Sequence, residues 1–256
     1  MNATATVSLL QPISLVDLNE RAALQTRIDR KYALQRSEAA EVLACLDQST
    51  QVLEIDGSRS ASYESEYFDT PNLVSYRMAA QGRRRRFKLR TRAYLDSCEA
   101  WLEVKTRGAR KTTVKNRVEH ALESRDQLTA SARDYADVAL ESIGFTDPSE
   151  LELLPTLVTR YDRTTLFVEA SESRATIDTN LTWEDGNGHV LSLPDLVIVE
   201  TKSGSRTSEI DRLLWSCGHR PATISKFGTG LAAIRPDLPS NKWARVLRQH
   251  FSRSST

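Results

Sequence analysis

The sequence predicts an α+β fold in which an antiparallel sheet closes into a barrel and helices pack on its outside. Its candidate strands alternate between charged and apolar residues, so each has a charged face and an apolar face. Capped helical segments separate several of these strands. Such a sheet can close with its apolar face against the helices and its charged face lining a tunnel, and about eight strands leave room inside for side chains or one ligand.

The strongest strand signal lies within residues 83–92, where seven of the ten residues are basic and none is acidic. The cations at even positions are Arg84, Arg86, Lys88, Arg90 and Arg92. Phe87 and Leu89 occupy the opposite parity, which places them on the other face of a strand. Cations two residues apart repel one another unless an anion lies between them. This pattern favours a polyanionic ligand with many phosphate oxygens.

The overall charge shows that this basic segment is local. The chain has 256 residues, with 35 basic and 34 acidic side chains and a formal net charge of +1. A general nucleic-acid binder usually carries a basic excess over the whole domain, and single-strand binders interleave aromatic residues for base stacking. Only Phe87 is aromatic within 83–92, and it lies on the wrong face. The composition therefore predicts a focused anion site and no nucleic-acid partner.

Other features limit the class of protein. No apolar run approaches the roughly 20 residues that span a bilayer, and residues 1–10 lack the pattern of a signal peptide. Three scattered cysteines have no zinc-site spacing and fit a reducing compartment, so a cytoplasmic location is expected. Without a linker or a strong repeat, we expect one domain over 1–256, with a core at about 25–235 and a basic C-terminal helix within 236–256.

Local signals place the elements in order. The expected strands are 27–34, 63–68, 83–95, 99–106, 113–121, 156–169, 173–183, 189–193 and 196–202. The expected helices are 14–26, 37–46, 69–82, 124–144, 207–217, a short helix after Lys226 and a terminal helix from Ser240. Ser14 and Ser37 are suitable N-caps, Pro71 suits a first helical turn, and Gly82 suits a helix end. The segment 185–188 is a hairpin turn signal.

Several other strands repeat the charged face. The same-face pairs are Asp29 with Lys31, Glu103 with Lys105, Lys115 with Arg117, Tyr161 with Arg163, Arg174 with Asp178, and Glu200 with Lys202. For one strand, a solvated face of an antiparallel sheet is a sufficient explanation. Six such strands together favour a charged interior.

A series of short motifs also resembles a known family. In order along the chain, they are Thr26-Arg27-Ile28-Asp29-Arg30-Lys31-Tyr32, Tyr67-Phe68-Asp69-Thr70, Lys88-Leu89-Arg90-Thr91-Arg92, Leu102-Glu103-Val104-Lys105-Thr106, Val114-Lys115-Asn116-Arg117, Tyr161-Asp162-Arg163-Thr164, Ile177-Asp178-Thr179, Val199-Glu200-Thr201-Lys202 and Ser225-Lys226-Phe227. Together they resemble the polyphosphate polymerase domain of the vacuolar transporter chaperone (VTC) family, over roughly residues 25–235. Each motif alone is weak, but the full set in register is specific.

The resemblance implies a triphosphate tunnel metalloenzyme, whose closed antiparallel barrel holds a phosphate chain. It implies phosphate contacts from Lys31, Arg90, Arg92, Lys105, Lys115, Tyr161, Arg163, Ser225 and Lys226. It implies a catalytic set of Lys31, Arg90, Arg92, Lys105, Arg163 and Glu200, with Glu200 holding Mn²⁺ or Mg²⁺. By parity alone, further tunnel residues are Arg86, Lys88, Arg117, Arg174 and Lys202. Glu66, Glu103 and Asp178 are expected to orient basic residues or assist the metal.

The function that this resemblance implies is metal-dependent transfer of the γ-phosphate of ATP to a growing polyphosphate chain. A triphosphatase acting on ATP or short polyphosphate, and a polyphosphate-binding module without turnover, stay open as alternatives. The expected partners are ATP and polyphosphate or triphosphate, with no integral membrane segment; protein partners and oligomeric state stay open. Two departures matter. Thr223 stands where the fungal enzymes have another lysine, and the sequence contains neither an SPX domain nor the fungal membrane helices.

Overall fold

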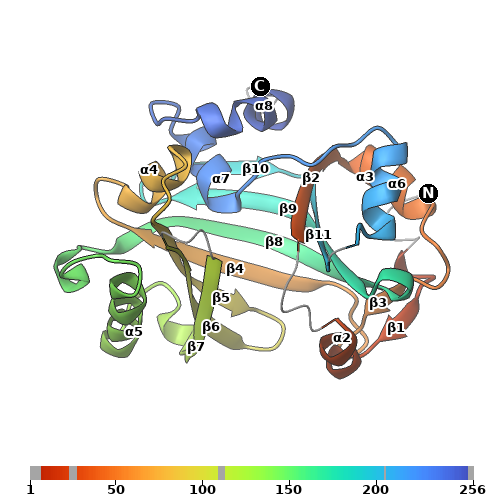
Figure 1. The fold of residues 1–256 in the computed structure, drawn as a ribbon, viewed down its shortest axis with the longest axis horizontal. Coiled ribbons are helices and arrows are strands. Elements are labelled where there is room, and N and C mark those ends of the chain that lie inside the picture. Colours follow the sequence, from red (N-terminus) through yellow and green to blue (C-terminus); the bar gives the residue numbers. More distant parts are fainter. Residues whose placement is uncertain (1–6, 23–27, 109–112, 205, 253–256) are drawn as a thin grey trace.

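A large, mostly antiparallel sheet forms the centre of the molecule (Figure 1). The computed structural model describes residues 7–22, 28–108, 113–204 and 206–252. The main path of the sheet runs β2–β11–β9–β8–β4–β5–β6–β7. Its strands are β2 (Ile28–Gln35), β4 (Ala61–Asp69), β5 (Arg86–Tyr94), β6 (Glu99–Arg107), β7 (Thr113–His120), β8 (Leu154–Val168), β9 (Ser173–Asp185) and β11 (Leu196–Ser203). Three short strands extend it: β1 (Gln11–Ile13), β3 (Gln51–Leu53) and β10 (Val190–Leu193).

Helices connect and cover these strands. They are α2 (Leu15–Arg21), α3 (Arg36–Ala44), α4 (Val74–Ala80), α5 (Ala130–Glu141), α6 (Glu209–Ser216) and α7 (Lys226–Ile234). Short turns of 3₁₀-helix are η1 (Leu122–Ser124), η2 (Pro148–Glu150) and η3 (Glu169–Ser171). The C-terminal helical segment comprises η4 (Asn241–Trp243), α8 (Ala244–Val246) and the π-helical η5 (Leu247–Phe251). Among the residues described, no helix has both the length and the apolar character needed to cross a membrane.

The expected closure of the barrel is not observed. β2 and β7 are the two ends of the sheet path, and no ladder joins them within the described ranges. At β2, the backbone N–H of Ala222 donates to the carbonyl of Lys31 over 2.7 Å, so the segment leading into α7 occupies this edge. At the other end, most residues of β7 are exposed. The antiparallel α+β architecture is confirmed, whereas the described sheet is open.

The outer face of the sheet is apolar and carries two helical layers. α5 covers one side, where its alanines and Leu140 pack on Phe87, Leu89 and Leu102. α3 and α6 cover the other side, over β2, β9 and β11. Figure 1 shows these layers at opposite ends of the sheet. The alternation in β5 thus has the predicted consequence, with Phe87 and Leu89 buried under a helix.

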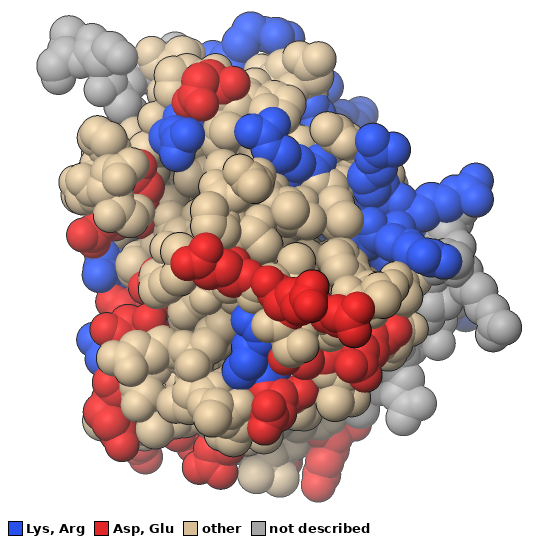
Figure 2. Space-filling model, turned by 90° about the vertical axis from the view of Figure 1, so that its left-hand side faces the viewer, with Lys and Arg blue, Asp and Glu red and all other residues tan. Residues whose placement is uncertain are grey.

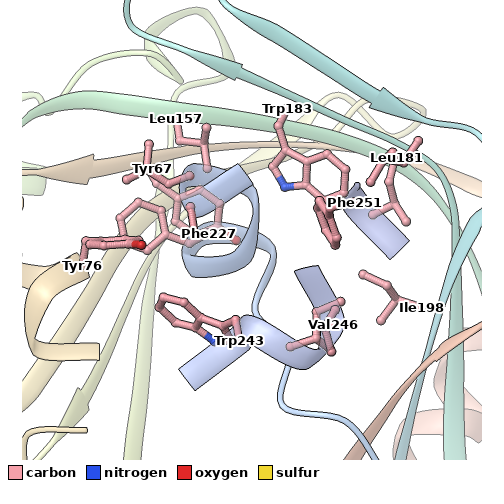
Figure 3. Close-up of a cluster of buried hydrophobic side chains, with 14 of the residues drawn as sticks. Tyr67, Tyr76, Leu157, Leu181, Trp183, Ile198, Phe227, Trp243, Val246 and Phe251 are labelled. Carbon is pink, nitrogen blue, oxygen red and sulfur yellow. The ribbon is translucent and has the colours of Figure 1, made fainter. Parts of the chain in front are cut away.

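The inner face departs from the prediction that all helices pack outside. α7 and the C-terminal segment lie on it and form the largest apolar cluster, in which Phe227 stacks on Tyr67 with ring centroids 4.9 Å apart (Figure 3). A Cβ at Gly230 would lie 2.2 Å from Trp183, so only glycine permits this approach. At the opposite end of the inner face, Leu18 of α2 packs with Phe167.

Several predicted boundaries change for local reasons. The first helix ends at Arg21, and 23–27, including Thr26 and Arg27 of the first motif, lie outside the described residues, as do 253–256 at the C-terminus. β5 begins at Arg86, so Arg84 is not part of the strand. α3 begins one residue before Ser37, and the Glu38 carboxylate accepts from the backbone N–H of Gln35 instead.

Two further helices begin later than expected. α4 begins at Val74 because the buried carboxylate of Asp69 accepts from the backbone N–H groups of Ser75 and Tyr76. α5 begins at Ala130, where Thr129 is the N-cap in place of Ser124. The strands β1 and β3 were not predicted, since three residues each give no alternation to read.

Candidate functional site

The cations predicted for the site come together on the inner face between α2 and α7. Lys31 lies on β2, Arg90 and Arg92 on β5, Lys105 on β6, Lys115 on β7, Arg163 and Tyr161 on β8, Glu200 on β11, and Ser225 and Lys226 at the start of α7. Cross-strand pairing links them: Tyr67 pairs with Arg90, and Tyr63 pairs with Tyr161. The residues are therefore on one surface although they span most of the chain.

The centre of this surface is a pair of stacked tyrosines surrounded by three cations. The rings of Tyr63 and Tyr161 are 5.3 Å apart and nearly parallel. The Arg92 and Arg163 guanidinium groups lie 5.6 and 5.1 Å from the Tyr63 ring, and the Lys226 ammonium lies 4.1 Å from that of Tyr161. Aromatic faces attract cations without neutralising them, so these groups keep their charge for a ligand.

Among the polar atoms that are buried without a partner in the described residues, the hydroxyl of Tyr161 and Nε of Arg92 lie at this centre. Burial by itself raises the pKa of Tyr161, but Arg92, Arg163 and Lys226 outweigh it and leave that pKa below its ordinary value. An unsatisfied buried donor is costly and calls for an acceptor. These two unsatisfied donors therefore indicate a site for an anionic ligand.

Asp178 on β9 holds two of the cations. Arg163 donates to it through Nε at 2.6 Å and Nη2 at 2.9 Å, and the Lys226 ammonium also donates to it. The carboxylate is buried, which would raise its pKa, but the two cations lower the pKa to about 2. Asp178 therefore stays ionised and fixes the position of both cations.

Glu103 on β6 does the same for a second group. Arg90 donates to it through Nε at 2.8 Å, and Lys115 donates to it at 2.6 Å. Nη1 of Arg92 is 3.9 Å from the same carboxylate. Burial opposes ionisation of Glu103, but these three cations hold its pKa well below the usual range. The expectation that Glu103 and Asp178 orient basic residues agrees with these contacts.

The strand register also brings three lysines side by side. Lys88, Lys105 and Lys115 are directly paired across β5, β6 and β7. Like charges opposite one another destabilise a sheet. Burial, together with Lys31 and Arg90, lowers the pKa of Lys88 well below its ordinary value. Such a row indicates an anion-binding surface more than a structural one.

The start of α7 contributes backbone as well as side chains. Ser225 is its N-cap and accepts from the N–H of Gly228 at 3.2 Å, while Lys88 donates to the same hydroxyl at 2.9 Å. The Trp183 indole donates to the Lys226 carbonyl at 2.9 Å, which fixes the helix start against β9. The helix dipole adds partial positive charge beside Lys226.

Glu200 differs from the other two carboxylates. Its ion pairs with Lys31 and Lys202 are 3.7 and 3.9 Å long, beyond hydrogen-bond distance. Burial raises the pKa of Glu200, but the surrounding cations lower that pKa by more. The net effect is a decrease, so the Glu200 carboxylate is ionised. Carboxylate oxygens suit Mg²⁺ or Mn²⁺, which also take substrate phosphate oxygens. The described residues contain no cluster of three metal-ligating His, Cys, Asp or Glu side chains. A metal ion at this site would therefore be held by Glu200 and by oxygens of the ligand.

Glu66, which was expected to orient basic residues or assist the metal, lies elsewhere. It pairs with Thr91 on the opposite face from Arg90, so it is not part of this site; burial and Glu64 raise its pKa to about 7.

Arg117 and Arg174 lie on the inner face, as their parity predicts. Arg117 pairs with Glu103 across the strands and packs on the Trp101 ring at 4.4 Å. Arg174 pairs with Lys202 and donates to Asn19 beside α2.

Sequence reasoning missed two tyrosines. The Tyr67 hydroxyl accepts from Arg90 at 2.9 Å, and Tyr63 lies between Arg92 and Arg163. Tyr63, Ser65 and Tyr67 occupy alternate positions of β4, so they lie on one face of the sheet. This alternation is the sequence signal that could have identified both tyrosines.

Surface charge is segregated in spite of the near-zero net charge. Figure 2 shows a band of acidic residues on the face that carries α5, with a separate group of Lys and Arg side chains at its edge.

The sequence matches one known family. The VTC domain family matches residues 26–235, which include every residue of the site described above. The chain belongs to the VTC domain family. No curated protein matches the sequence.

Solved structures of similar arrangement exist at low identity. One, the HpAC1 protein from Hippeastrum, described as having a dominant triphosphatase activity, is 18% identical, with 84% of this chain and 98% of that chain covered and a TM-score of 0.48. A Pyrococcus horikoshii OT3 protein is 13% identical, with 80% and 98% covered and a TM-score of 0.43.

Proposed function

We propose that this VTC domain is a metal-dependent polyphosphate polymerase that transfers the γ-phosphate of ATP to a growing polyphosphate chain. The observation that carries the proposal is the convergence of Arg92, Arg163 and Lys226 on the stacked rings of Tyr63 and Tyr161, where the Tyr161 hydroxyl has no partner among the described residues. Membership of the VTC domain family supports it.

The phosphates bind by charge and hydrogen bonds. Arg90, Arg92 and Arg163 offer planar guanidinium groups for bidentate contacts, and Lys31, Lys105 and Lys226 offer point charges. Tyr161 and Nε of Arg92 donate to phosphate oxygens and so become satisfied. Because Glu103 and Asp178 already fix several of these cations, little reorganisation is needed when a ligand arrives.

The reaction is an in-line phosphoryl transfer. A terminal phosphate oxygen of the chain attacks the γ-phosphorus of ATP, a new P–O bond forms, and the bond from the γ-phosphorus to the β,γ-bridging oxygen breaks. The bond electrons leave with ADP, and the chain is longer by one phosphate. The protein aligns the two phosphates and neutralises charge on their oxygens, which is the main catalytic requirement. Lys31, Arg90, Arg92, Lys105 and Arg163 have this role.

A divalent cation, Mn²⁺ or Mg²⁺, would be held by Glu200 together with phosphate oxygens, and would supply further charge neutralisation. The long ion pairs of Glu200 leave its oxygens able to accept such an ion.

The deciding experiment incubates purified protein with ATP and Mn²⁺ or Mg²⁺, and resolves the products on a gel stained for polyphosphate. Long chains support the polymerase. Orthophosphate alone supports the triphosphatase alternative, and triphosphate binding without turnover supports the binding module.

Variants at the site sharpen this test. Glu200→Gln is expected to abolish turnover and keep most triphosphate binding, because it retains shape and removes the anionic oxygen. Arg92→Ala is expected to weaken binding and turnover together. Glu169→Gln, at an exposed ion pair with Arg21, is the control and should leave both unchanged. Full metal-dependent activity in Glu200→Gln would refute the assigned carboxylate role.

A further inference from the structure

We propose that the turn between α4 and β5, together with the exposed side of α4, is a docking surface for an acidic peptide segment of a protein partner. Its cations are Arg77, Arg83, Arg84 and Arg85, and all four side chains are exposed. The last three belong to the basic segment 83–92 but precede β5, which begins at Arg86. This inference goes beyond the proposed function, because it gives a role to cations outside the phosphate site.

The end of α4 holds this turn in a defined conformation. Gly82 has a φ of 67°, and its N–H donates to the carbonyl of Ala79 at 3.3 Å. The N–H of Arg83 donates to the carbonyl of Met78 at 2.9 Å. These two hydrogen bonds form a Schellman motif, which ends a helix and reverses the chain beside it. The arginines that follow Gly82 are therefore presented next to the exposed side of α4.

The arginines surround a shallow hollow on α4. Its volume is about 450 Å³, and its lining consists of Val74, Arg77, Met78, Gln81, Arg83, Arg84 and Arg85. Val74 and Met78 are half-buried and form the apolar part of this lining. Methionine and arginine are both enriched in protein interfaces. An apolar floor with a cationic rim suits a ligand that carries apolar and anionic groups side by side.

The positive charge of the rim is not neutralised locally. Among the described residues that line the hollow, none is acidic. Nε of Arg77 donates to the carbonyl of Asn72 at 2.9 Å, and Nε of Arg83 donates to the side-chain oxygen of Gln81 at 3.0 Å. Both acceptors are neutral, so they orient the guanidinium groups and leave their charge for a partner.

Asp237 is an acidic side chain that this charge reaches. A hydrogen bond from Arg235 is the main cause that lowers the pKa of Asp237, and Arg77 contributes to the decrease. The ion pair of Asp237 is with Arg235 at 3.3 Å, so it does not occupy the rim.

The surroundings of the turn favour a narrow partner over a flat one. A Cβ at Gly144 would lie 3.0 Å from Nη1 of Arg85, so this guanidinium lies against the chain just beyond α5. On α5, Asp134 and Glu141 are exposed, and Figure 2 shows acidic residues across this face. An anionic bilayer or a nucleic-acid duplex would approach these acidic side chains and be repelled. A peptide segment can enter the hollow without covering them.

Carboxylates are the chemistry that the rim recognises. A guanidinium group binds a carboxylate through two parallel hydrogen bonds, and clusters of arginine recognise acidic motifs in this way. Single exposed ion pairs are weak, so the peptide must offer several carboxylates to several arginines. An apolar side chain between them would rest on Val74 and Met78.

The test titrates the full chain with a short labelled peptide in which several glutamates surround one leucine, and measures fluorescence anisotropy. The peptide should bind at low salt and be released as salt rises. In Arg84→Gln/Arg85→Gln, its affinity should fall about tenfold, because two of the rim cations are removed. Replacing the glutamates of the peptide with glutamines should abolish binding. Met78→Gln should weaken the leucine peptide and leave its glycine counterpart unchanged.

The matched control removes two exposed cations elsewhere. Arg21→Gln/Arg212→Gln breaks surface pairs with Glu169 and Glu209 and has the same change of net charge. It should leave peptide affinity unchanged, and thermal unfolding of each variant checks that it folds.

The outcomes separate this inference from the proposed function. Tripolyphosphate affinity and product formation should stay the same in Arg84→Gln/Arg85→Gln. If they fall together with peptide affinity, the turn belongs to the phosphate site and the docking surface is refuted. Equal peptide binding by both double variants would also refute it, as would vesicles containing phosphatidylserine that bind through Arg84 and Arg85 when the peptide does not. A protein that binds the peptide but no tripolyphosphate would refute the proposed function alone.

Discussion

One face of the same sheet has two contrasting regions. Where α7 covers it, the strands present Tyr67, Leu157 and Trp183, which are buried in an apolar cluster. On the same and neighbouring strands, it also presents Arg90, Arg163 and their carboxylate partners. The apolar region obtains its stability from packing, whereas the cationic region contains pairs that repel. The comparison indicates that the first region stabilises the fold so that the second can remain prepared for an anion.

The two regions meet at the start of α7. Phe227, in the apolar cluster, directly follows Lys226, which contacts Asp178 and Tyr161. Packing of α7 therefore determines the position of Lys226, the cation that we propose binds phosphate. This coupling can be tested from either side.

The largest effect is expected in the apolar region. Trp183→Ala should lower the free energy of unfolding by about 3–5 kcal/mol, because it leaves a cavity under α7 and removes the hydrogen bond to the Lys226 carbonyl. Urea unfolding measures this, and triphosphate affinity should fall as Lys226 loses its support. Gly230→Ala tests the same contact by overpacking. A loss below about 1 kcal/mol in both variants would contradict the role given to this packing.

The next effect concerns the carboxylates of the cationic region. Asp178→Asn should lower the free energy of unfolding by about 3 kcal/mol, because Arg163 and Lys226 then repel without a counter-charge. The same variant should gain more thermal stability from triphosphate than the unmodified protein does, since the ligand replaces the missing charge. Asp137→Asn, at an ion pair on α5, is the control and should show neither effect.

The alternation of charge along the strands was sufficient to predict which side chains share a face of the sheet. Arg90 and Arg92 lie on the inner face and Phe87 and Leu89 lie under α5, as their parities require. Local periodicity encodes this information, because successive side chains of a strand point to opposite sides.

The position of α7 on the inner face could not be predicted from the alternation of residues. Trp183 packs against α7 and shares the inner face with Asp178, although the two positions have different parity. The reason is that β9 is irregular at Asn180, where φ is 53°. Closure depends on pairing between distant strands, and neither β2 nor β7 has a sequence signal for its partner. Glu66 was expected to assist the site, but its position on β4 pairs it with Thr91 on the outer face.

A smaller effect follows from pH. Asp178 and Glu103 have pKa values lowered in the folded protein, so their stabilising contribution is fully present above the unfolded pKa of about 4 and is lost as pH falls through the folded values. For Asp178, a decrease from 3.8 to about 2 corresponds to about 2 kcal/mol, lost between roughly pH 4.5 and 2. Unfolding free energies at pH 5 and 3 measure it. The slope should be shallower in Asp178→Asn, and an unchanged slope would contradict the assignment.

The smallest effect separates helix capping from ligand binding at the boundary of the two regions. Ser225→Ala should cost about 1 kcal/mol of stability, because α7 loses its N-cap, and should also weaken triphosphate binding because Lys88 loses its acceptor. Ser208→Ala removes the equivalent cap of α6, on the outer layer, and should cost a similar amount with no change in triphosphate affinity. Thermal unfolding and calorimetric titration of both variants measure the two quantities separately. If the two serines changed affinity equally, the start of α7 would be a structural cap only, and the boundary between the regions would lie closer to Arg163 than to Ser225.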